Sequence, residues 1–299
     1  MKRFKIINPT IGSDPEFCGL NKDTGNIVSV IDKIPGTKRA EFEIGNGCTI
    51  QVDNVNCEFT IPPATNLDDF IGSINYCVEV ANKMLAPHNI VLGTMSSNVY
   101  SAEDINHPVA KKFGCEPSFD AFYQSIAQVG KPENKRLRSA GFHLHVGFDD
   151  MENLVLDDDD IFNFIFCCDL FLGLPSIFID KDTQRRSLYG SPSNFRYKKI
   201  KGTHVIEYRS LGGNLLYNNI TIAYCWDQLQ LAIDYFNNGN LDELIKDMEG
   251  IRDAIQNSDK KSGYNYINKY GIELPCFTVD KNQFTFDKVA EVEKLFQLT

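Results

Sequence analysis

The sequence predicts an α+β fold in which a largely antiparallel sheet is backed by helices. Short strand-like segments fill the first sixty residues, helical patterns dominate after residue 220, and strands do not alternate strictly with helices between them. Strict alternation is typical of parallel Rossmann and TIM architectures, so those two classes are not expected. No shift in composition marks a boundary, and we expect a single domain over 1–299 with a helical C-terminal part from 220.

Composition and charge narrow the class of protein. With 42% hydrophobic and 23% charged residues, the 299-residue chain is typical of a globular protein and not of disordered, collagen-like or coiled-coil chains. The net charge of −10 argues against a nucleic-acid partner, because such binding depends on Lys and Arg contacts to phosphates. The most apolar segment, 161–174, is too short to span a bilayer and contains Asn163 and Asp169, so a buried helix is expected.

The cysteines and the N-terminus favour a reducing compartment. Nine cysteines, an odd number without a C-x-x-C pair, suggest neither a disulfide framework nor a zinc knuckle. Residues 1–9 lack the apolar run of a signal peptide. We therefore expect free thiols, a cytoplasmic location and no membrane contact.

The N-terminal half reads as short strands followed by one long helix. Because Gly and Asn clusters separate short apolar runs, strands are expected at 4–7, 27–31, 40–44, 49–52 and 57–61. Apolar residues at helical spacing over 67–85 predict an amphipathic helix with Asn66 as its cap. A strand at 90–92 follows, and the proline-rich stretch 96–134 is expected to be irregular apart from one helix at 119–127.

The C-terminal half begins with a strand and ends in helices. A strand is expected at 140–148, and the acidic run 157–160 is expected to cap the apolar helix that follows it. A basic loop at 185–201 leads into a strand at 203–210. The remaining helices are expected at 220–236, 241–256 and 286–296.

The segment His143-Leu144-His145 is the most specific chemical feature. Side chains alternate along a strand, so the imidazoles of His143 and His145 share one face, and Gly147 leaves space beside them. The pattern indicates a cation or phosphate site; a solvated polar face of the sheet is the other interpretation.

Two pairs of charged residues repeat this spacing. Glu207 and Arg209 could hold a metal and a phosphate side by side, or could form an ion pair at a sheet edge. Asp14 and Glu16 flank Pro15, which cannot donate to a strand ladder and so suggests an edge or interrupted strand.

Asp53 and Glu58 form a further acidic cluster, and taken singly each acidic group could be turn chemistry. Together, these segments set acidic or imidazole groups among apolar residues, where unpaired charges are costly. Oxygen-rich ligands with few histidines favour Mg²⁺ or Mn²⁺ over zinc, and several carboxylates can hold two or more ions.

The basic loop would supply the opposite charge to an anionic substrate. Arg186 and Arg196 lie in this loop, and metals combined with arginines are typical of phosphoryl transfer. Neither a Walker motif nor a Rossmann glycine fingerprint is present, so a nucleotide would be held by metals and side chains.

Five motifs occur in one order along residues 11–216 and carry a resemblance. They are Gly12-x-Asp14-Pro15-Glu16-Phe17, Gly36-Thr37-Lys38, Asp53-Asn54-x3-Glu58-Phe59-x-Ile61-Pro62-Pro63-Ala64, Gly141-x-His143-x-His145-x-Gly147, and Tyr189-Gly190-x4-Phe195-Arg196 leading to Glu207-Tyr208-Arg209. In these motifs the chain resembles the phage-type carboxylate–amine ligases (COOH–NH2 ligase, type 2), which are similar to glutamine synthetase and the glutamate–cysteine ligases in their catalytic fold. The helices after residue 220 carry no diagnostic residue.

The resemblance implies a glutamine synthetase-like catalytic domain, in which a curved antiparallel sheet surrounds ATP and two or more Mg²⁺ or Mn²⁺ ions. The matching metal ligands are Glu16, Glu58, Glu207 and either His143 or His145, with Asp14 and Asp53 as further candidates. Catalysis would fall to Glu207 and to Arg196 and Arg209, which neutralise the transferred phosphate. The nucleotide would also meet Lys38, His145 and Arg186, with Lys38 contacting phosphate or carboxylate.

The function that follows is an ATP-dependent carbon–nitrogen ligase that forms an amide or peptide bond through an acyl phosphate. Small-molecule or peptide carboxylates and amines are the expected substrates, a homo-oligomer is left open, and a phage origin would place the enzyme in the host bacterial cytoplasm. The alternatives are a metal-dependent hydrolase that uses His143, His145 and the carboxylates to activate water, and a non-catalytic binding or virion-associated module. The chain departs from the family at Ser191-Pro192-Ser193 and at Lys198, Lys199 and Lys201, so the acceptor stays open.

Overall fold

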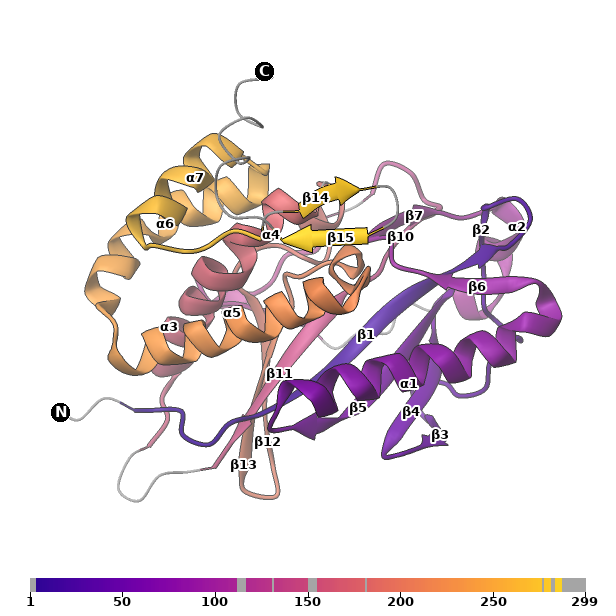
Figure 1. The fold of residues 1–299 in the computed structure, drawn as a ribbon, viewed down its shortest axis with the longest axis horizontal. Coiled ribbons are helices and arrows are strands. Elements are labelled where there is room, and N and C mark those ends of the chain that lie inside the picture. The colour runs from indigo at the N-terminus through magenta and orange to yellow at the C-terminus, as the bar shows by residue number, and fades with distance from the viewer. Residues whose placement is uncertain are drawn as a thin grey trace.

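One large antiparallel sheet with helices against one face dominates the structure, a computed structural model (Figure 1). The structure describes residues 4–111, 117–130, 132–149, 155–180, 182–275, 277–280 and 283–286. The strands are β1 (Thr10–Asn21), β2 (Ile27–Val28), β3 (Phe42–Gly45), β4 (Cys48–Asp53), β5 (Asn56–Ala64), β6 (Ile90–Gly93), β7 (Ser97–Val99), β8 (Phe119–Asp120), β9 (Ser125–Ile126), β10 (Leu137–Ser139), β11 (Phe142–Phe148), β12 (Asn194–Ile200), β13 (Thr203–Tyr208), β14 (Phe277–Asp280) and β15 (Gln283–Phe286). The α-helices are α1 (Leu67–Leu85), α2 (Ala102–Asn106), α3 (Asp158–Cys168), α4 (Leu174–Ile179), α5 (Asn219–Asn238), α6 (Leu241–Asn257) and α7 (Lys260–Lys269), and the short helical turns are η1 (Ala86–His88), η2 (Val109–Lys111), η3 (Asp169–Gly173), η4 (Arg185–Ser187) and η5 (Gly213–Leu216).

The main sheet has 11 strands in the order β3-β4-β5-β1-β11-β13-β12-β8-β9, with β2 and β6 also paired to β1. Every pairing between these strands is antiparallel. The predicted α+β class, with a large antiparallel sheet backed by helices, is therefore confirmed.

Strand β1 lies in the middle of this sheet, between β5 and β11, so the prediction that Pro15 marks an edge or interruption is wrong. Pro15 lacks an N–H, but the residues around it pair on both sides. Ser13 pairs with Ile61 of β5, and the amide of Glu16 donates to the carbonyl oxygen of Gly141 at 2.9 Å.

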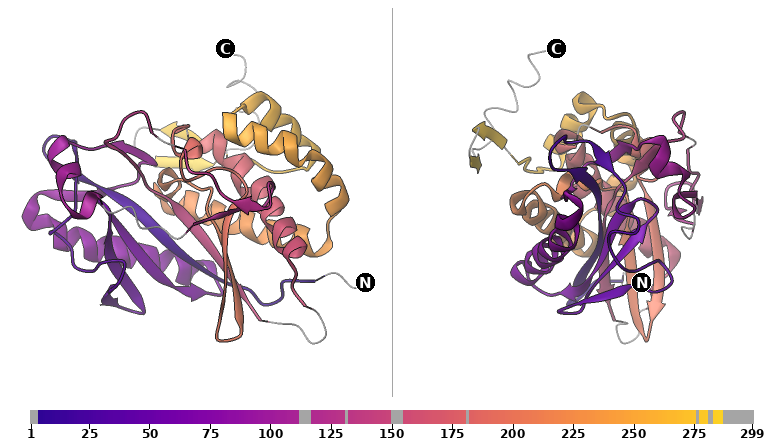
Figure 2. Two further views of the ribbon diagram at one scale, coloured as in Figure 1. Left: turned by 180° about the vertical axis from the view of Figure 1, so that it is seen from behind. Right: turned by 90° about the vertical axis from the view of Figure 1, so that its right-hand side faces the viewer.

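The two faces of the sheet differ in chemistry because side chains alternate along each strand. One face carries apolar side chains in the core, among them Ile11, Phe17, Phe59, Leu144, Val146 and Ile206. Helices α1 and α5 cover this face, where the rings of Phe70 and Trp226 lie 5.2 Å apart, and Figure 2 shows the sheet from its other side. The opposite face presents the charged residues of the predicted motifs.

The predicted helix caps are confirmed. Helix α1 spans the predicted 67–85, and the side chain of Asn66 accepts a hydrogen bond from the Asp69 amide. Asp157 and Asp160 form a reciprocal capping box at the start of α3. The side chains of the acidic run therefore accept hydrogen bonds from N–H groups that have no partner within the helix, as expected.

The apolar helix is longer than the sequence indicated. Helices α3, η3 and α4 run on as one segment, Asp158–Ile179, whose 22 residues are long and apolar enough to cross a membrane, yet 78% of its most apolar window is buried inside the protein. The prediction that this segment is too short to span a bilayer was therefore wrong. The helix does not end at residue 174 but continues through Pro175, because the π-helical turn η3 lets the Leu174 amide donate to the Asp169 carbonyl. Its predicted burial is confirmed, and the seven described cysteines form no disulfide with one another.

Three local predictions are wrong. Residues 4–7 form no strand, because the side-chain amide of Asn237 bonds both the N–H and the carbonyl of Ile6, at 2.9 and 2.8 Å. The helix expected at 119–127 is the hairpin β8–β9, whose turn is held by Asp120. Part of the predicted loop 185–201 is strand β12, and the helix expected at 286–296 lies outside the described residues apart from Phe286 in β15.

Candidate functional site

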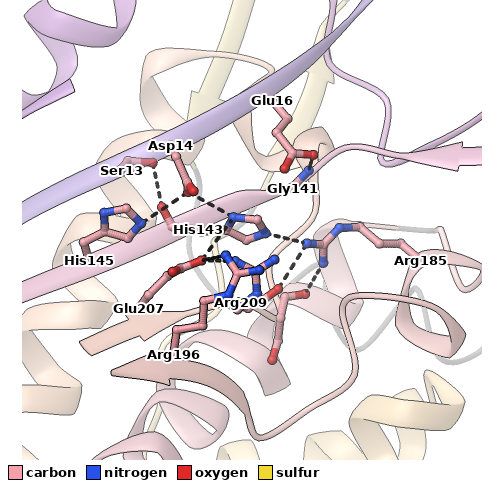
Figure 3. A network of polar contacts seen from close by, with 11 residues as sticks. Ser13, Asp14, Glu16, Gly141, His143, His145, Arg185, Arg196, Glu207 and Arg209 are labelled. Atoms are coloured by element: carbon pink, nitrogen blue, oxygen red, sulfur yellow. Dashed lines mark hydrogen bonds and ion pairs between the residues drawn. The ribbon is translucent and has the colours of Figure 1, made fainter. Parts of the chain in front are cut away.

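Strand register brings the predicted polar residues together on the open face of the sheet. Asp14 on β1 is opposite His143 on β11. His145 on β11 is opposite Glu207 on β13, which is opposite Arg196 on β12. These side chains come from β1, β11, β13 and β12, which are neighbours in the sheet, and Figure 3 shows them converging.

Asp14 lies between the two imidazoles (Figure 3). Its Oδ1 is 2.9 Å from Nδ1 of His143 and 3.3 Å from Nε2 of His145. Burial alone would raise the pKa of Asp14, but the two imidazoles and their hydrogen bonds hold this pKa well below its ordinary value. Asp14 is therefore a carboxylate at neutral pH.

His143 is held from both sides and carries no charge at neutral pH. Nη2 of Arg185 lies 3.2 Å from Nε2 of His143, and because a guanidinium can only donate, Nδ1 must carry the proton that faces Asp14. Burial, together with the nearby charges of Arg209 and Arg185, lowers the pKa of His143 to about 3. Both ring nitrogens of His143 already have a partner. His145 is therefore the histidine that could bind a metal ion.

Arg185, which the sequence placed in the basic loop without a role of its own, lies in the site. Its guanidinium is buried and also donates to the carbonyl oxygens of Arg209 and Ser210, at 3.1 and 2.9 Å. A Cβ at Gly190 would lie 1.9 Å from Nη1 of Arg185, and one at Gly141 would lie 2.6 Å from Nη2. The two motif glycines therefore make room for this arginine, and they were the signal that could have identified it.

Arg186, which was predicted to contact the nucleotide, points elsewhere. Its guanidinium donates to the carbonyl oxygens of Asp182 and Asp180, at 2.7 and 3.2 Å, and to the hydroxyl of Ser258 at 2.8 Å. The structure thus brings Arg185, and not Arg186, to the histidines.

Glu207 joins the histidines to the arginines. Oε1 of Glu207 contacts Nη1 of Arg209, and lies 3.5 Å from Nη1 of Arg196. Asp14, His145 and Glu207 each offer a ligand atom within 4.8 Å of the others. We call these three residues the histidine cluster.

A second group, the carboxylate cluster, consists of Glu16, Asp53 and Glu58, whose ligand atoms also lie within 4.8 Å of one another. Glu16 and Glu58 are opposite each other on β1 and β5, and the Gly141 amide donates to Glu16 at 2.8 Å. Nζ of Lys38 lies 2.8 Å from Oδ1 of Asp53, so this lysine lies at the carboxylate cluster.

The carboxylate cluster carries more negative charge than its surroundings balance. Burial, followed by the charges of Asp53 and Asp14, raises the pKa of Glu16 to about 7. Burial and Asp53 raise the pKa of Glu58 well above its ordinary value, although Lys38 opposes this. Glu58 is 8% exposed, and its Oε2 is buried without a hydrogen-bond partner.

These donor sets fit hard divalent cations. Carboxylate oxygens with at most one imidazole suit Mg²⁺ or Mn²⁺. The orphaned oxygen of Glu58 is the kind of buried polar atom that a cation would satisfy. Asp14 and Glu16 are two residues apart on one strand, so the clusters are separated by about 7 Å along it.

Asp169 is a further buried residue that the motifs did not indicate. It is 0% exposed and accepts hydrogen bonds from the Ser193 amide at 3.0 Å, the Ser193 hydroxyl at 2.7 Å and the Tyr208 hydroxyl at 2.8 Å. Ser193 has a φ of 65° and directly precedes β12, and Tyr208 lies between Glu207 and Arg209. Asp169 thus anchors the unusual Ser-Pro-Ser turn against the strands that carry the arginines.

Comparisons with known proteins give fold-level likenesses only. No family model matches the chain, and no curated protein matches its sequence. Among solved structures, a GmaS/ADP complex matches with a TM-score of 0.36 and 11% identity over 97% of this chain and 73% of the other. A glutamine synthetase from Plasmodium falciparum matches with a TM-score of 0.32 and 11% identity over 76% of this chain and 52% of the other. At this identity and these TM-scores, neither likeness assigns an activity to this chain.

Proposed function

We propose that the protein is an ATP-dependent carbon–nitrogen ligase that joins a carboxylate to an amine. The observation that carries the proposal is the placing of two carboxylate-rich clusters on one face of the sheet, together with the buried Arg185 and Arg209 and the half-buried Arg196. Divalent cations beside arginines are what transfer of a phosphoryl group requires, because its transition state spreads negative charge over several oxygens.

Each part of the site has a role in this proposal. The histidine cluster and the carboxylate cluster would each hold Mg²⁺ or Mn²⁺, and the bound cations would neutralise phosphate oxygens. Arg196 and Arg209 both contact Glu207, and their guanidinium groups would bind the transferred phosphate. His143 keeps Asp14 oriented, and Lys38 balances Asp53.

The chemistry consists of two displacements. An oxygen of the carboxylate substrate attacks the γ-phosphorus of ATP, and ADP leaves with the electrons of the broken P–O bond. The amine nitrogen then attacks the acyl carbon, phosphate leaves with the electrons of the C–O bond, and the nitrogen loses a proton. The product is an amide.

Hydroxylamine trapping tests this proposal without knowledge of the natural amine. The protein is incubated with ATP, Mg²⁺, hydroxylamine and a panel of carboxylic acids, and hydroxamate and ADP are measured. We expect at least one acid to give both products in equal amounts, and Glu207→Gln and Arg209→Ala to lower the rate by about 10²-fold or more. Arg136→Ala, at an exposed arginine outside the site, is the control that keeps the wild-type rate.

One result would count against the assigned residues, and another would count against the ligase itself. Hydroxamate formation at the wild-type rate in Glu207→Gln and Arg209→Ala would remove those residues from the mechanism. Metal-dependent hydrolysis of amides or phosphoesters without ATP would support the hydrolase instead, with the histidine cluster activating water.

A further inference from the structure

Gln51, which belongs to none of the sequence motifs, lies beside the carboxylate cluster. Strands β4, β5 and β1 are neighbours in the sheet, and their pairing sets Gln51 opposite Glu58 and Glu58 opposite Glu16. Directly opposed residues project from the same face of a sheet, with Cβ atoms about 5 Å apart. Gln51 is therefore the end of a row of three polar side chains that crosses the cluster on the open face.

The side chain of Gln51 is long enough to reach the cluster. Asp53 lies two residues further along β4 and so on the same face. Its carboxylate offers a ligand atom within 4.8 Å of those of Glu16 and Glu58. A glutamine side chain is one methylene longer than an aspartate, and Gln51 starts directly opposite Glu58. An oxygen from this position can therefore join the same ion.

The amide oxygen of Gln51 is not engaged elsewhere. The residue is 6% exposed, and its Oε1 is buried without a hydrogen-bond partner among the residues that the structure describes. Oε2 of Glu58, on the residue directly opposite, is likewise buried and unpaired within that part of the chain. Two opposed side chains with unpaired buried oxygens are unfavourable unless a donor or a cation lies between them.

A cation suits this degree of burial better than a water molecule. Oxygen ligands lie about 2.1 Å from Mg²⁺, whereas a hydrogen-bonded water lies about 2.8 Å from its partner oxygen. Oxygens that a water cannot touch can therefore still surround an ion.

The two other amides beside the cluster differ from Gln51. Oδ1 of Asn54 accepts a hydrogen bond from Nε of Arg138 at 2.8 Å, and Oδ1 of Asn56 accepts one from the hydroxyl of Tyr100. Both oxygens are occupied, so of these three amides Gln51 is the one that can serve as a ligand.

We propose that Gln51 is the fourth ligand of a divalent cation bound at the carboxylate cluster. The cluster supplies three carboxylates, and Oε1 of Gln51 adds a neutral oxygen, which strengthens coordination without adding charge repulsion. The assignment rests on the proposed function, which puts a cation at this cluster.

Titration of the full chain with Mn²⁺ in the absence of ATP, followed by electron paramagnetic resonance of the free ion, tests this assignment. We expect the wild type to bind two ions, one at each cluster. Gln51→Leu should weaken the binding of one ion by about tenfold or more, as is typical when a group that supports a metal is removed. His145→Ala should weaken the other ion, and the double variant both. Gln51→Glu keeps an oxygen in place and should bind at least as tightly as the wild type.

Thermal unfolding in EDTA separates ligation from folding. Leucine removes an unpaired buried oxygen, so Gln51→Leu should unfold in EDTA at or above the wild-type temperature, and Mn²⁺ should raise that temperature less than in the wild type. Gln228→Leu is the matched control, because Gln228 is 4% exposed and its Oε1 has no partner in the described chain, but it lies on α5. It should bind both Mn²⁺ ions as the wild type does.

The assignment of Gln51 is overturned if Gln51→Leu binds both ions as tightly as the wild type, if Gln51→Glu binds as weakly as Gln51→Leu, or if the wild type binds only the ion that His145→Ala weakens. Hydroxamate formation by the wild type, with Mn²⁺ binding unchanged in Gln51→Leu, would refute the ligand and leave the ligase standing. Weakened Mn²⁺ binding in Gln51→Leu, with no hydroxamate from any acid, would support the ligand and refute the ligase.

Discussion

Replacing Glu58 by glutamine should stabilise the metal-free protein at high pH. Two unit charges 4.8 Å apart repel by about 3 kcal/mol at an effective dielectric constant of 20, and Glu58 faces two other carboxylates at up to this distance. Glu58 partly escapes this repulsion by taking up a proton, since its pKa is raised. We therefore expect the gain to grow as the pH rises and the cluster ionises, up to about 2 kcal/mol.

The wild type should lose stability over the same pH range. A carboxyl whose folded pKa is raised contributes stability that is fully present below its ordinary pKa and lost as the pH rises through the folded value. For Glu16 these values are 4.5 and about 7, so its contribution disappears mainly between about pH 4.5 and 7. The loss is at most about 3 kcal/mol, and a bound cation should restore it.

Thermal unfolding in EDTA and in Mg²⁺, at pH 5.5 and 8.5, measures both effects. In EDTA at pH 8.5, Glu58→Gln should unfold several degrees above the wild type, and Mg²⁺ should raise the unfolding temperature of the wild type much more than that of the variant. Glu249→Gln, at an exposed position on α6, is the charge-matched control. A variant that unfolds below the wild type in EDTA at pH 8.5, or that responds equally to Mg²⁺, would refute the reasoning.

Two other substitutions test the support of the site. Asp169→Ala removes the acceptor for three buried donors of Ser193 and Tyr208, so denaturant unfolding should show a loss of about 3 kcal/mol or more. Gly190→Ala places a Cβ 1.9 Å from Arg185, so it should displace that guanidinium and lower the hydroxamate rate at least about tenfold.

Each of these has a matched control. Tyr208→Phe removes one of the three donors to Asp169, so it should lose about 1 kcal/mol; an equal loss in both variants would contradict the proposed anchor. Gly72→Ala lies on the exposed side of α1 with no atom near its added Cβ, so it should keep the rate and stabilise by up to about 1 kcal/mol. A normal hydroxamate rate in Gly190→Ala would show that Arg185 is not needed where it lies.

The sequence by itself determined the features that depend on near neighbours. Helix α1 follows from its apolar periodicity and the Asn66 cap, because residues three and four apart meet on one helix face. Strand alternation likewise placed His143 and His145 on one face of β11, and grouped Glu207 of β13 with Arg209, which directly follows that strand. Most of the charged residues of the site were therefore identified from spacing and motif order.

Only the tertiary structure decided how those residues are grouped. Asp14 and His143 are 129 positions apart, and nothing in either local segment specifies that their strands pair in this register. The same register separates the histidine cluster from the carboxylate cluster. Arg185, and not Arg186, reaches the histidines because Gly141 and Gly190 leave space for its guanidinium.

The central position of β1 is decided in the same way. Pro15 weakens the local signal for a strand, and pairing with β5 on one side and β11 on the other compensates for the missing donor. The sequence did not reveal strand β12 for a related reason. A lysine-rich segment is typical of a loop, and this one is a strand because it pairs with β13. Pairing energy comes from residues distant in sequence, so local composition cannot reveal it.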